Sequence, residues 1–337
     1  MALNKFKTLA AGAIAVAGTI SAAQFSAAMA ADTVTFQLDW LPGGDKAPVY
    51  VCIEKGFCAE EGIEVKVEPG RGSSEAITKL STGVSDIGSA DIGALMAAKV
   101  TEDVPITAVM SIFNKGPHAF FVLKDSGIEK IEDIKGKQVA TSPFTSSNVF
   151  LPLVLKDVGM TEADITLTKS DPGALGPMLM TGSTDVIIAW MTNVAIFTNQ
   201  AEQAGKEIMA FPWDAAGLEL YSASLLASDK FLSERPDVAK RFVKAFTKSL
   251  EYVKANPHEA AVAMVAQIPE LSVADIEGAI NDTMVLEFND VTEKDGLGVF
   301  KADRLAATWE RVSAAQGLEK GALDPETIVD RSFLPES

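Results

Sequence analysis

The chain contains few of the residue types that carry metal or nucleophilic chemistry. It has 337 residues but only two histidines and two cysteines, and these form no set at metal-ligand spacing with acidic residues. No G-x-S-x-G sequence occurs, and the Gly-Arg-Gly at 70–72 lacks the Lys-Ser/Thr pair of a P-loop. A metalloenzyme, an α/β-type serine hydrolase and a nucleotide-hydrolysing protein are therefore not indicated. We expect no metal site and no cofactor.

Long hydrophobic runs are also missing after residue 30, so nothing there predicts a membrane span. The first 30 residues differ from the rest. Lys5 and Lys7 precede a stretch at 8–23 made mostly of Ala, Gly, Ile and Val, and Ala28-Met29-Ala30 is typical of a signal-peptidase site. We expect a cleavable signal peptide over residues 1–30, with cleavage after Ala30, and an exported protein.

Positive charge is scarce. Without Lys5 and Lys7, 27 basic residues remain against 46 acidic ones, a net charge of 27 − 46 = −19. This balance opposes binding to nucleic acid or anionic membranes. Of the six arginines only Arg71 lies in a loop predicted to face a cleft, so a carboxylate clamped by paired arginines is not expected. For Cys52 and Cys58, six positions apart, a disulfide and two unpaired buried thiols both remain open.

Strands alternate with helices along the chain, which predicts an α/β fold. The hydrophobic patterns predict strands at 33–39, 63–67, 86–88, 106–113, 119–123, 137–141, 165–169, 185–190, 207–211 and 220–227. They predict helices at 47–55, 73–80, 147–158, 174–180, 194–204, 236–255, 257–267, 272–284 and 301–315. Two sheet-building series followed by a helical tail indicate two lobes.

Two crossings between the lobes are predicted, one in the polar segment 124–137 and one near 222–228. The first lobe would then comprise residues 31–123 and 226–337, and the second residues 124–225. Such a layout leaves a ligand cleft between the lobes, at the carboxyl ends of the strands.

The residues suited to binding a ligand follow predicted strands. Trp40 follows the first strand, and serines or threonines at helix starts could offer backbone donors from both sides of the cleft. The candidate ligand-binding residues are Trp40, Ser73, Ser74, Asp91, His118, Ser142, Thr145, Ser146, Trp190 and Tyr221. Trp40 could instead pack between lobes, and His118 could be structural.

Four segments carry a family resemblance: "LDWLPGGDKAPVYVCIEKGFCAEEGIEVKVEPGRGSSEAITKLSTGVSDIGSAD", "DSGIEKIEDIKGKQVA", "GSTDVIIAW" and "DPETIVDRSFLP". Together they resemble the periplasmic binding proteins of the taurine, sulfonate, nitrate and thiamine-precursor group. The resemblance implies a type II periplasmic binding protein, α/β, two-lobed, with a helical C-terminal tail. It also implies a monomer that delivers its ligand to an ABC permease and, indirectly, to the ATPase, and a Tyr near the ligand at Tyr221.

Within that group the Asp-Trp-x-Pro opening is most similar to the pyrimidine-precursor binders and the related pyrimidine synthases. Where the binders often carry Asn and His after this opening, the chain has Gly43 and Lys46, and it lacks the synthases' cysteine-rich motif. The expected ligand is a small pyrimidine-like heteroaromatic compound, because an indole suits a flat ring. An organic sulfonate such as taurine is the alternative, followed by a synthase-type enzyme or a receptor sensor domain.

Overall fold

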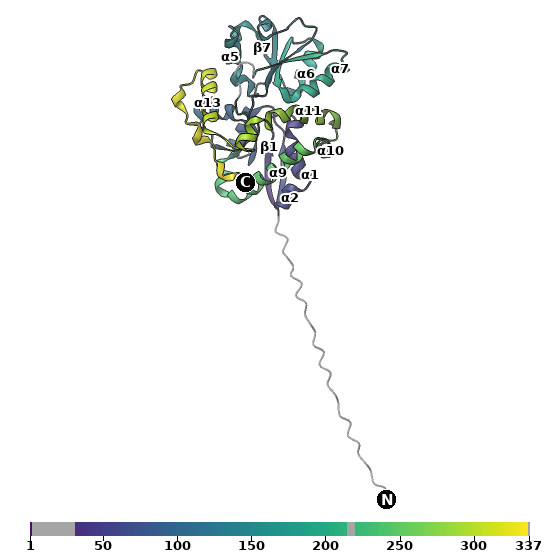
Figure 1. Cartoon of the computed structure of the whole chain (residues 1–337), viewed down its shortest axis with the longest axis vertical. Helices are drawn as coiled ribbons and strands as arrows, with labels where there is room; N and C mark the ends of the chain where they lie inside the picture. Colours follow the sequence, from purple (N-terminus) through teal and green to yellow (C-terminus); the bar gives the residue numbers. More distant parts are fainter. Residues whose placement is uncertain (2–30, 214–219, 336–337) are drawn as a thin grey trace. The chain divides into compact units, whose positions relative to one another are not determined.

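The computed structural model describes Met1 and residues 31–213 and 220–335. The expected signal peptide and its cleavage point at Ala30 lie outside the described residues. Residues 31–337 form one compact unit. Within its described part, two mixed five-stranded sheets are each flanked by helices, which confirms the predicted two-lobed α/β fold (Figure 1).

The first sheet has the strand order β2-β1-β3-β10-β4. Its strands are β1 (Asp32–Gln37), β2 (Ile63–Glu68), β3 (Ile87–Asp91), β4 (Ile106–Ser111) and β10 (Ala223–Ser228). β1 runs parallel to β2 and β3, whereas β10 runs antiparallel to β3 and β4. The carboxyl ends of β1, β2 and β3 therefore meet at one edge, which is where ligands bind in open α/β sheets.

The second sheet repeats this arrangement with the order β7-β6-β8-β5-β9. Its strands are β5 (His118–Leu123), β6 (Gln138–Thr141), β7 (Thr166–Lys169), β8 (Val186–Trp190) and β9 (Ile208–Pro212). β6 is parallel to β7 and β8, and β5 is antiparallel to β8 and β9.

The helices connect the strands and then form the C-terminal part. They are α1 (Ala47–Glu54), α2 (Phe57–Glu60), α3 (Ser73–Ser81), α4 (Ile92–Thr101), α5 (Ser147–Asp157), α6 (Pro172–Thr181), α7 (Val194–Gln203), α8 (Asp229–Glu234), α9 (Pro236–Ala255), α10 (Pro257–Gln267), α11 (Val273–Glu287), α12 (Asp290–Asp295) and α13 (Ala302–Gln316). The short helix η1 (Gly44–Lys46) precedes α1. The predicted helices are present, while α2, α4, α8 and α12 were not predicted.

The predicted crossings between lobes need correction. β5 pairs with β8 and β9 and so belongs to the second sheet, not to the first lobe as expected from the boundary at residue 123. The chain passes to the second sheet between Ser111 and His118, before the polar segment 124–137. The chain returns to the first sheet before β10 (Ala223–Ser228). The expected boundary between residues 225 and 226 is therefore wrong, because it falls inside this strand. The prediction was wrong because it took the polar segment 124–137 for a crossing between lobes. This segment connects β5 to β6 inside the second lobe.

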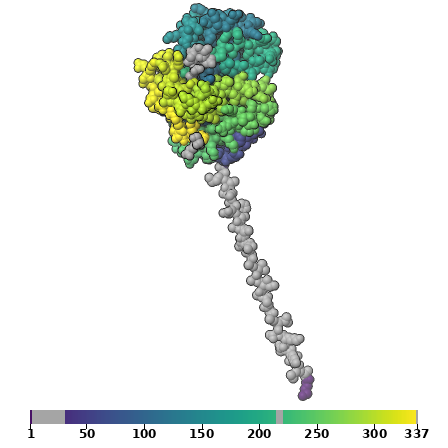
Figure 2. Space-filling view, in the orientation of Figure 1, coloured from purple at the N-terminus to yellow at the C-terminus, as the bar shows by residue number. Residues whose placement is uncertain are grey.

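Among the C-terminal helices, α9 packs on the first sheet, α10 packs on α1 and α9, and α13 packs on α4 and α5. Phe36 of β1 stacks on Phe242 and Phe246 of α9, with ring centroids 5.7 and 5.9 Å apart. Phe242 and Phe246 are four residues apart and therefore lie on one face of α9, and this face is buried against the sheet. The tail also contacts the second lobe, since the backbone N–H of Ala195 in α7 donates to Asp282 of α11 over 3.1 Å. In the space-filling view the C-terminal green and yellow surface borders the blue-teal second lobe (Figure 2).

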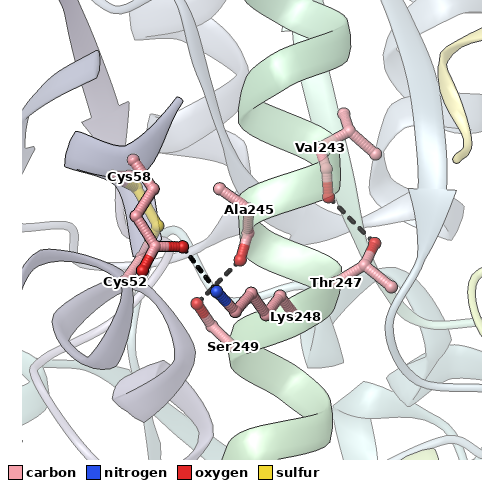
Figure 3. The surroundings of a disulfide bond; sticks show 8 residues. Cys52, Cys58, Val243, Ala245, Thr247, Lys248 and Ser249 are labelled. Atoms are coloured by element: carbon pink, nitrogen blue, oxygen red, sulfur yellow. Dashed lines mark hydrogen bonds and ion pairs between the residues drawn. A yellow bond between two sulfur atoms is a disulfide. The ribbon is translucent and has the colours of Figure 1, made fainter. Parts of the chain in front are cut away.

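Cys52 and Cys58 form a disulfide that joins α1 to α2 and settles the alternative left open by the sequence. Their Cα atoms are 5.2 Å apart, which is within the range for such bridges. Gly56 between them adopts φ +76, the left-handed conformation that ends α1 and turns the chain back. The bridge lies beside the turn of α9 that carries Ala245 and Ser249 (Figure 3).

Candidate functional site

A pocket lies where the strand ends of the two sheets face each other. Its lining residues are Asp39, Trp40, Asp45, Gly72, Ser73, Thr145, Ala189, Trp190, Thr192 and Asn193. The first five follow β1 and β2 in the first lobe, and the other five come from the second lobe. Both lobes therefore contribute to one pocket, and four of the expected ligand-binding residues line it: Trp40, Ser73, Thr145 and Trp190. That they bind a ligand stays a prediction.

The two tryptophans of the pocket reach across the lobes in opposite directions. Trp40, half-buried, extends from the first lobe onto the apolar cluster of the second lobe. Trp190 ends β8 of the second lobe and packs into the core of the first, with its ring centroid 6.0 Å from that of Phe113. Each indole is thus a wall of the pocket and part of the contact between lobes.

A buried ion cluster lies behind the tryptophans, and sequence reasoning missed it. The Lys46 ammonium binds the Asp39 carboxylate and lies 2.7 Å from Asp45. Burial lowers the pKa of Lys46, but the two carboxylates outweigh it and raise the pKa above its ordinary value, so the ammonium stays charged. It also lies 5.4 Å from the centre of the Trp190 ring, a cation–π distance. The Asp-Trp-x-Pro motif and the following Lys were the available signal.

The backbone of η1, which carries Asp45 and Lys46, packs closely against helix α11 and so fixes the position of this ion cluster. A Cβ atom on Gly44 would lie 2.3 Å from the backbone nitrogen of Ile280 in α11, so only glycine lets η1 approach that helix. Glu287, at the end of the same helix, is 1% exposed, and neither carboxylate oxygen has a partner among the described residues. Burial, together with the Asp45 charge and against that of Lys46, raises the pKa of Glu287 well above its ordinary value. The raised pKa favours the protonated, uncharged form of the Glu287 carboxyl group.

Asp91 and His118 lie beside the pocket, in a buried network that joins the lobes. The Asp91 carboxylate accepts hydrogen bonds from Gly93 N (2.7 Å) and from the Ser222 hydroxyl (2.5 Å). His118 Nε2 lies 3.6 Å from Asp91 Oδ2, and its Nδ1 is 3.0 Å from the Ser147 hydroxyl. Neither Asp91 nor His118 lines the pocket, so the structure gives them a supporting position rather than the expected direct contact.

Ser73 connects this network to the pocket. Its hydroxyl accepts from the backbone N–H of Asp91 (3.1 Å) and donates to Asp39 (3.4 Å). The cap position of α3 is Gly72, and no side chain caps the helix. The hydroxyl is instead used within the site, because Asp39 and Asp91 come within its reach only in the folded sheet.

The loops 70–74 and 141–147 touch directly and form a contact that we call the latch, made by residues 71–74 and 142–145. Ser74 N donates to the carbonyl of Phe144 over 3.1 Å, and the Ser142 hydroxyl donates to the Arg71 carbonyl over 2.7 Å. The Arg71 guanidinium lies 5.0 Å from the Phe144 ring centre. Ser74 and Ser142 thus contact the opposite lobe and are not among the pocket-lining residues.

Two expected site residues lie elsewhere. Tyr221 is buried, and its hydroxyl donates to the Val299 carbonyl (3.1 Å) and accepts from Lys301 N (2.9 Å), away from the pocket. Ser146 precedes α5, and its buried hydroxyl has no partner among the described residues. Thr192 and Asn193, by contrast, line the pocket without having been predicted, because the turn after β8 carries no sequence signal.

Neither a metal site nor a membrane helix is found in the described chain. No three His, Cys, Asp or Glu side chains come together as candidate metal ligands within residues 31–213 and 220–335. Among the helices of this same part, none has the length and hydrophobicity needed to cross a bilayer.

Two α/β lobes around a pocket lined from both sides define the fold of periplasmic binding proteins. The alkanesulfonate-binding protein SsuA of Xanthomonas axonopodis pv. citri, solved with bound MOPS, has a TM-score of 0.70 to this chain at 15% identity, covering 90% of this chain and 99% of that one. At that identity the likeness concerns the fold.

The chain belongs to the NMT1/THI5-like family, whose sequence model matches residues 44–260. It is similar to the riboflavin-binding protein RibY of Chloroflexus aurantiacus, with 25% identity over 309 residues that cover 90% of this chain and 86% of the relative. It is also similar to the 4-amino-5-hydroxymethyl-2-methylpyrimidine phosphate synthase THI13 of Saccharomyces cerevisiae, with 25% identity over 254 residues, 72% of this chain and 74% of the relative. The predicted family resemblance is confirmed.

Proposed function

We propose that the chain is the periplasmic solute-binding component of an ABC importer. It captures a small heteroaromatic compound of the pyrimidine type between its lobes and delivers it, as a monomer, to a membrane permease and its ATPase. The observation that carries this proposal is the half-buried Trp40 indole in a pocket lined from both lobes. An indole offers a broad apolar face to a flat ring and loses little conformational freedom on binding.

An organic sulfonate such as taurine is the second candidate, favoured by the fold shared with the alkanesulfonate-binding protein. Two features weigh against an anion. The charged groups that line the described pocket are the carboxylates of Asp39 and Asp45, and Lys46 behind them is already paired with both. At the start of α3, where free amides would hold an anion, Ser74 N is bound to the Phe144 carbonyl.

A pyrimidine-synthase-type enzyme is the third candidate, because a yeast relative is named as such a synthase. An enzyme that forms a covalent intermediate on a lysine needs that lysine side chain as an uncharged amine. Lys46 does not offer one, because Asp39 and Asp45 raise its pKa and keep the ammonium charged. The charged state of Lys46 therefore favours the binding protein over the enzyme. We prefer the binding protein over a receptor sensor domain because the relative RibY is named as a binding protein.

A thermal-shift screen of the mature chain tests the proposal. The compounds are 4-amino-5-hydroxymethyl-2-methylpyrimidine, riboflavin, taurine and MOPS, and each compound that shifts the melting temperature is titrated calorimetrically. A ligand at 100 times its Kd adds about 2.7 kcal/mol to the free energy of unfolding, a readable shift. We expect a heteroaromatic compound to bind and to be recovered unchanged by mass spectrometry. Binding of taurine or MOPS alone would select the sulfonate alternative, and a converted product would select the enzyme.

A further inference from the structure

We propose that Trp190 binds the ligand through its indole Nε1–H, which donates a hydrogen bond to an acceptor atom of the ligand such as a ring nitrogen or a carbonyl oxygen. Trp40 then supplies the stacking surface, and the two tryptophans of the pocket have different tasks. This inference rests on the proposed function and names the ligand chemistry that the second lobe selects.

The surroundings of Trp190 leave little of its ring free for stacking. The Lys46 ammonium lies over the ring, 5.4 Å from its centre. Phe113 packs at 6.0 Å with a tilt of 55°, and His118 meets the indole edge-on at 5.9 Å. The residue is only 8% exposed. The Trp190 ring therefore has little exposed surface left on which a ligand ring could stack.

The Nε1–H of Trp190 is the part of the indole that still lacks a partner. Trp190 lines the pocket, yet its Nε1 is buried and has no hydrogen-bond acceptor among the described residues. A buried donor without an acceptor is unfavourable, and an acceptor atom on a bound ligand removes that penalty. The same logic makes a ligand without an acceptor at this point bind more weakly.

Trp190 is also held in place before any ligand arrives. Its position at the end of β8 is paired with His118 in the neighbouring strand β5, and Asn193 Nδ2 donates to the Trp190 carbonyl over 3.2 Å. A fixed donor loses little conformational entropy on binding, so its hydrogen bond contributes more to affinity than that of a mobile side chain.

Two other tryptophans provide internal controls. Trp309 Nε1 donates to the Lys320 carbonyl over 2.7 Å, so its N–H is already bonded. Trp213 resembles Trp190 in having a buried Nε1 without a partner among the described residues, but it does not line the pocket. Trp213→Phe therefore removes the same group at a residue that does not line the pocket, while its ring keeps a place 5.7 Å from that of His118.

The experiment combines calorimetry with NMR of the ¹⁵N-labelled indole groups, using 4-amino-5-hydroxymethyl-2-methylpyrimidine or whichever screened compound binds. We expect the Trp190 indole N–H signal to move downfield on saturation while that of Trp309 stays in place. Trp190→Phe, which keeps an aromatic ring but removes the donor, should raise Kd about tenfold, the effect of one hydrogen bond. Trp213→Phe should leave Kd within about twofold, below the effect of a lost hydrogen bond.

An unmoved Trp190 N–H signal in the wild-type protein overturns the assignment, even if Trp190→Phe fails to fold. Equal Kd values for a folded Trp190→Phe and the wild type overturn it too. In either case, weaker binding by a Trp40 variant leaves the proposed function standing. If none of the screened compounds binds, the proposed function fails, and the role of Trp190 fails with it.

Discussion

Replacing Gly72 by alanine is expected to weaken ligand binding by preventing the latch from closing. Gly72 has φ +154, and a Cβ atom there would lie 2.1 Å from the carbonyl carbon and oxygen of Phe144 in the opposite lobe. Ordinary contact begins at 3.4 Å, so the loops must separate by about 3.4 − 2.1 = 1.3 Å. The obstacle is backbone, which cannot rotate aside as a side chain would.

The loss in affinity follows from the contacts that this separation breaks. They are the hydrogen bonds from Ser74 N to Phe144 O (3.1 Å) and from the Ser142 hydroxyl to Arg71 O (2.7 Å). At about 1 kcal/mol each, they stabilise the closed state by about 2 kcal/mol, which corresponds to a roughly 30-fold increase in Kd.

The assay is calorimetric titration of the ligand together with small-angle scattering, and the matched control is Gly83→Ala. Gly83 has φ +72, and a Cβ atom built there meets nothing within 4 Å. Both substitutions place alanine where glycine is preferred and reduce the free energy of unfolding by about 1–2 kcal/mol. We expect ligand to favour the closed state and so to compact the wild-type protein on saturation. Only Gly72→Ala should raise Kd and reduce this compaction. Wild-type affinity with full compaction in a folded Gly72→Ala variant would refute the reasoning.

Three further predictions concern the pocket wall, the buried acid and the disulfide. Trp40→Ala should weaken ligand binding by at least ~1 kcal/mol, in the range of aromatic-pair energies, and leave ligand-free melting nearly unchanged; a lower melting temperature with intact affinity would make Trp40 a packing residue only. Because burial raises the folded-state pKa of Glu287 above 4.5, its contribution to stability is fully present below pH 4.5 and is lost as pH rises through the folded pKa. In urea unfolding, Glu287→Gln should therefore gain stability relative to wild type as the pH rises above 4.5, by at most about 1.4 kcal/mol per pH unit, and parallel pH profiles would contradict this. The Cys52→Ser, Cys58→Ser double variant should lose about 2 kcal/mol, as expected for so short a loop, and still fold and bind; two free thiols in the exported wild-type protein would show that the bridge does not form.

Local sequence signals determined most of the secondary structure. Helices α9 (Pro236–Ala255) and α10 (Pro257–Gln267) begin and end at the predicted residues, because each has Pro in its first turn and α9 has a strong apolar stripe. α4 escaped prediction for the opposite reason. Its first five residues, Ile92 to Met96, are all buried, so the polar-apolar period that reveals an amphipathic helix is absent.

The same signals also indicated the carboxyl-end loops that form the pocket. Trp40, Ser73 and Thr145 follow strands in the sequence and Trp190 ends one. The parallel pairing of β1 with β2 and of β6 with β8 brings all four strand ends to the edges that face each other. The family resemblance added the two-lobed fold. Neither signal, however, distinguished a residue that lines the pocket from one that supports it a few ångströms away.

Only the tertiary structure decided those roles, because they depend on partners far along the chain. Ser142 meets Arg71 across 71 positions, and Ser222 meets Asp91 across 131. Glu287 lies near the charges of Asp45 and Lys46 because helix α11 packs on η1. Hydrogen bonds and charge interactions act over a few ångströms, whereas sequence patterns report on neighbouring residues. Neighbouring residues therefore determine whether a segment is a helix or a strand. The contacts that a polar side chain makes within a site depend on which distant segment folds against it.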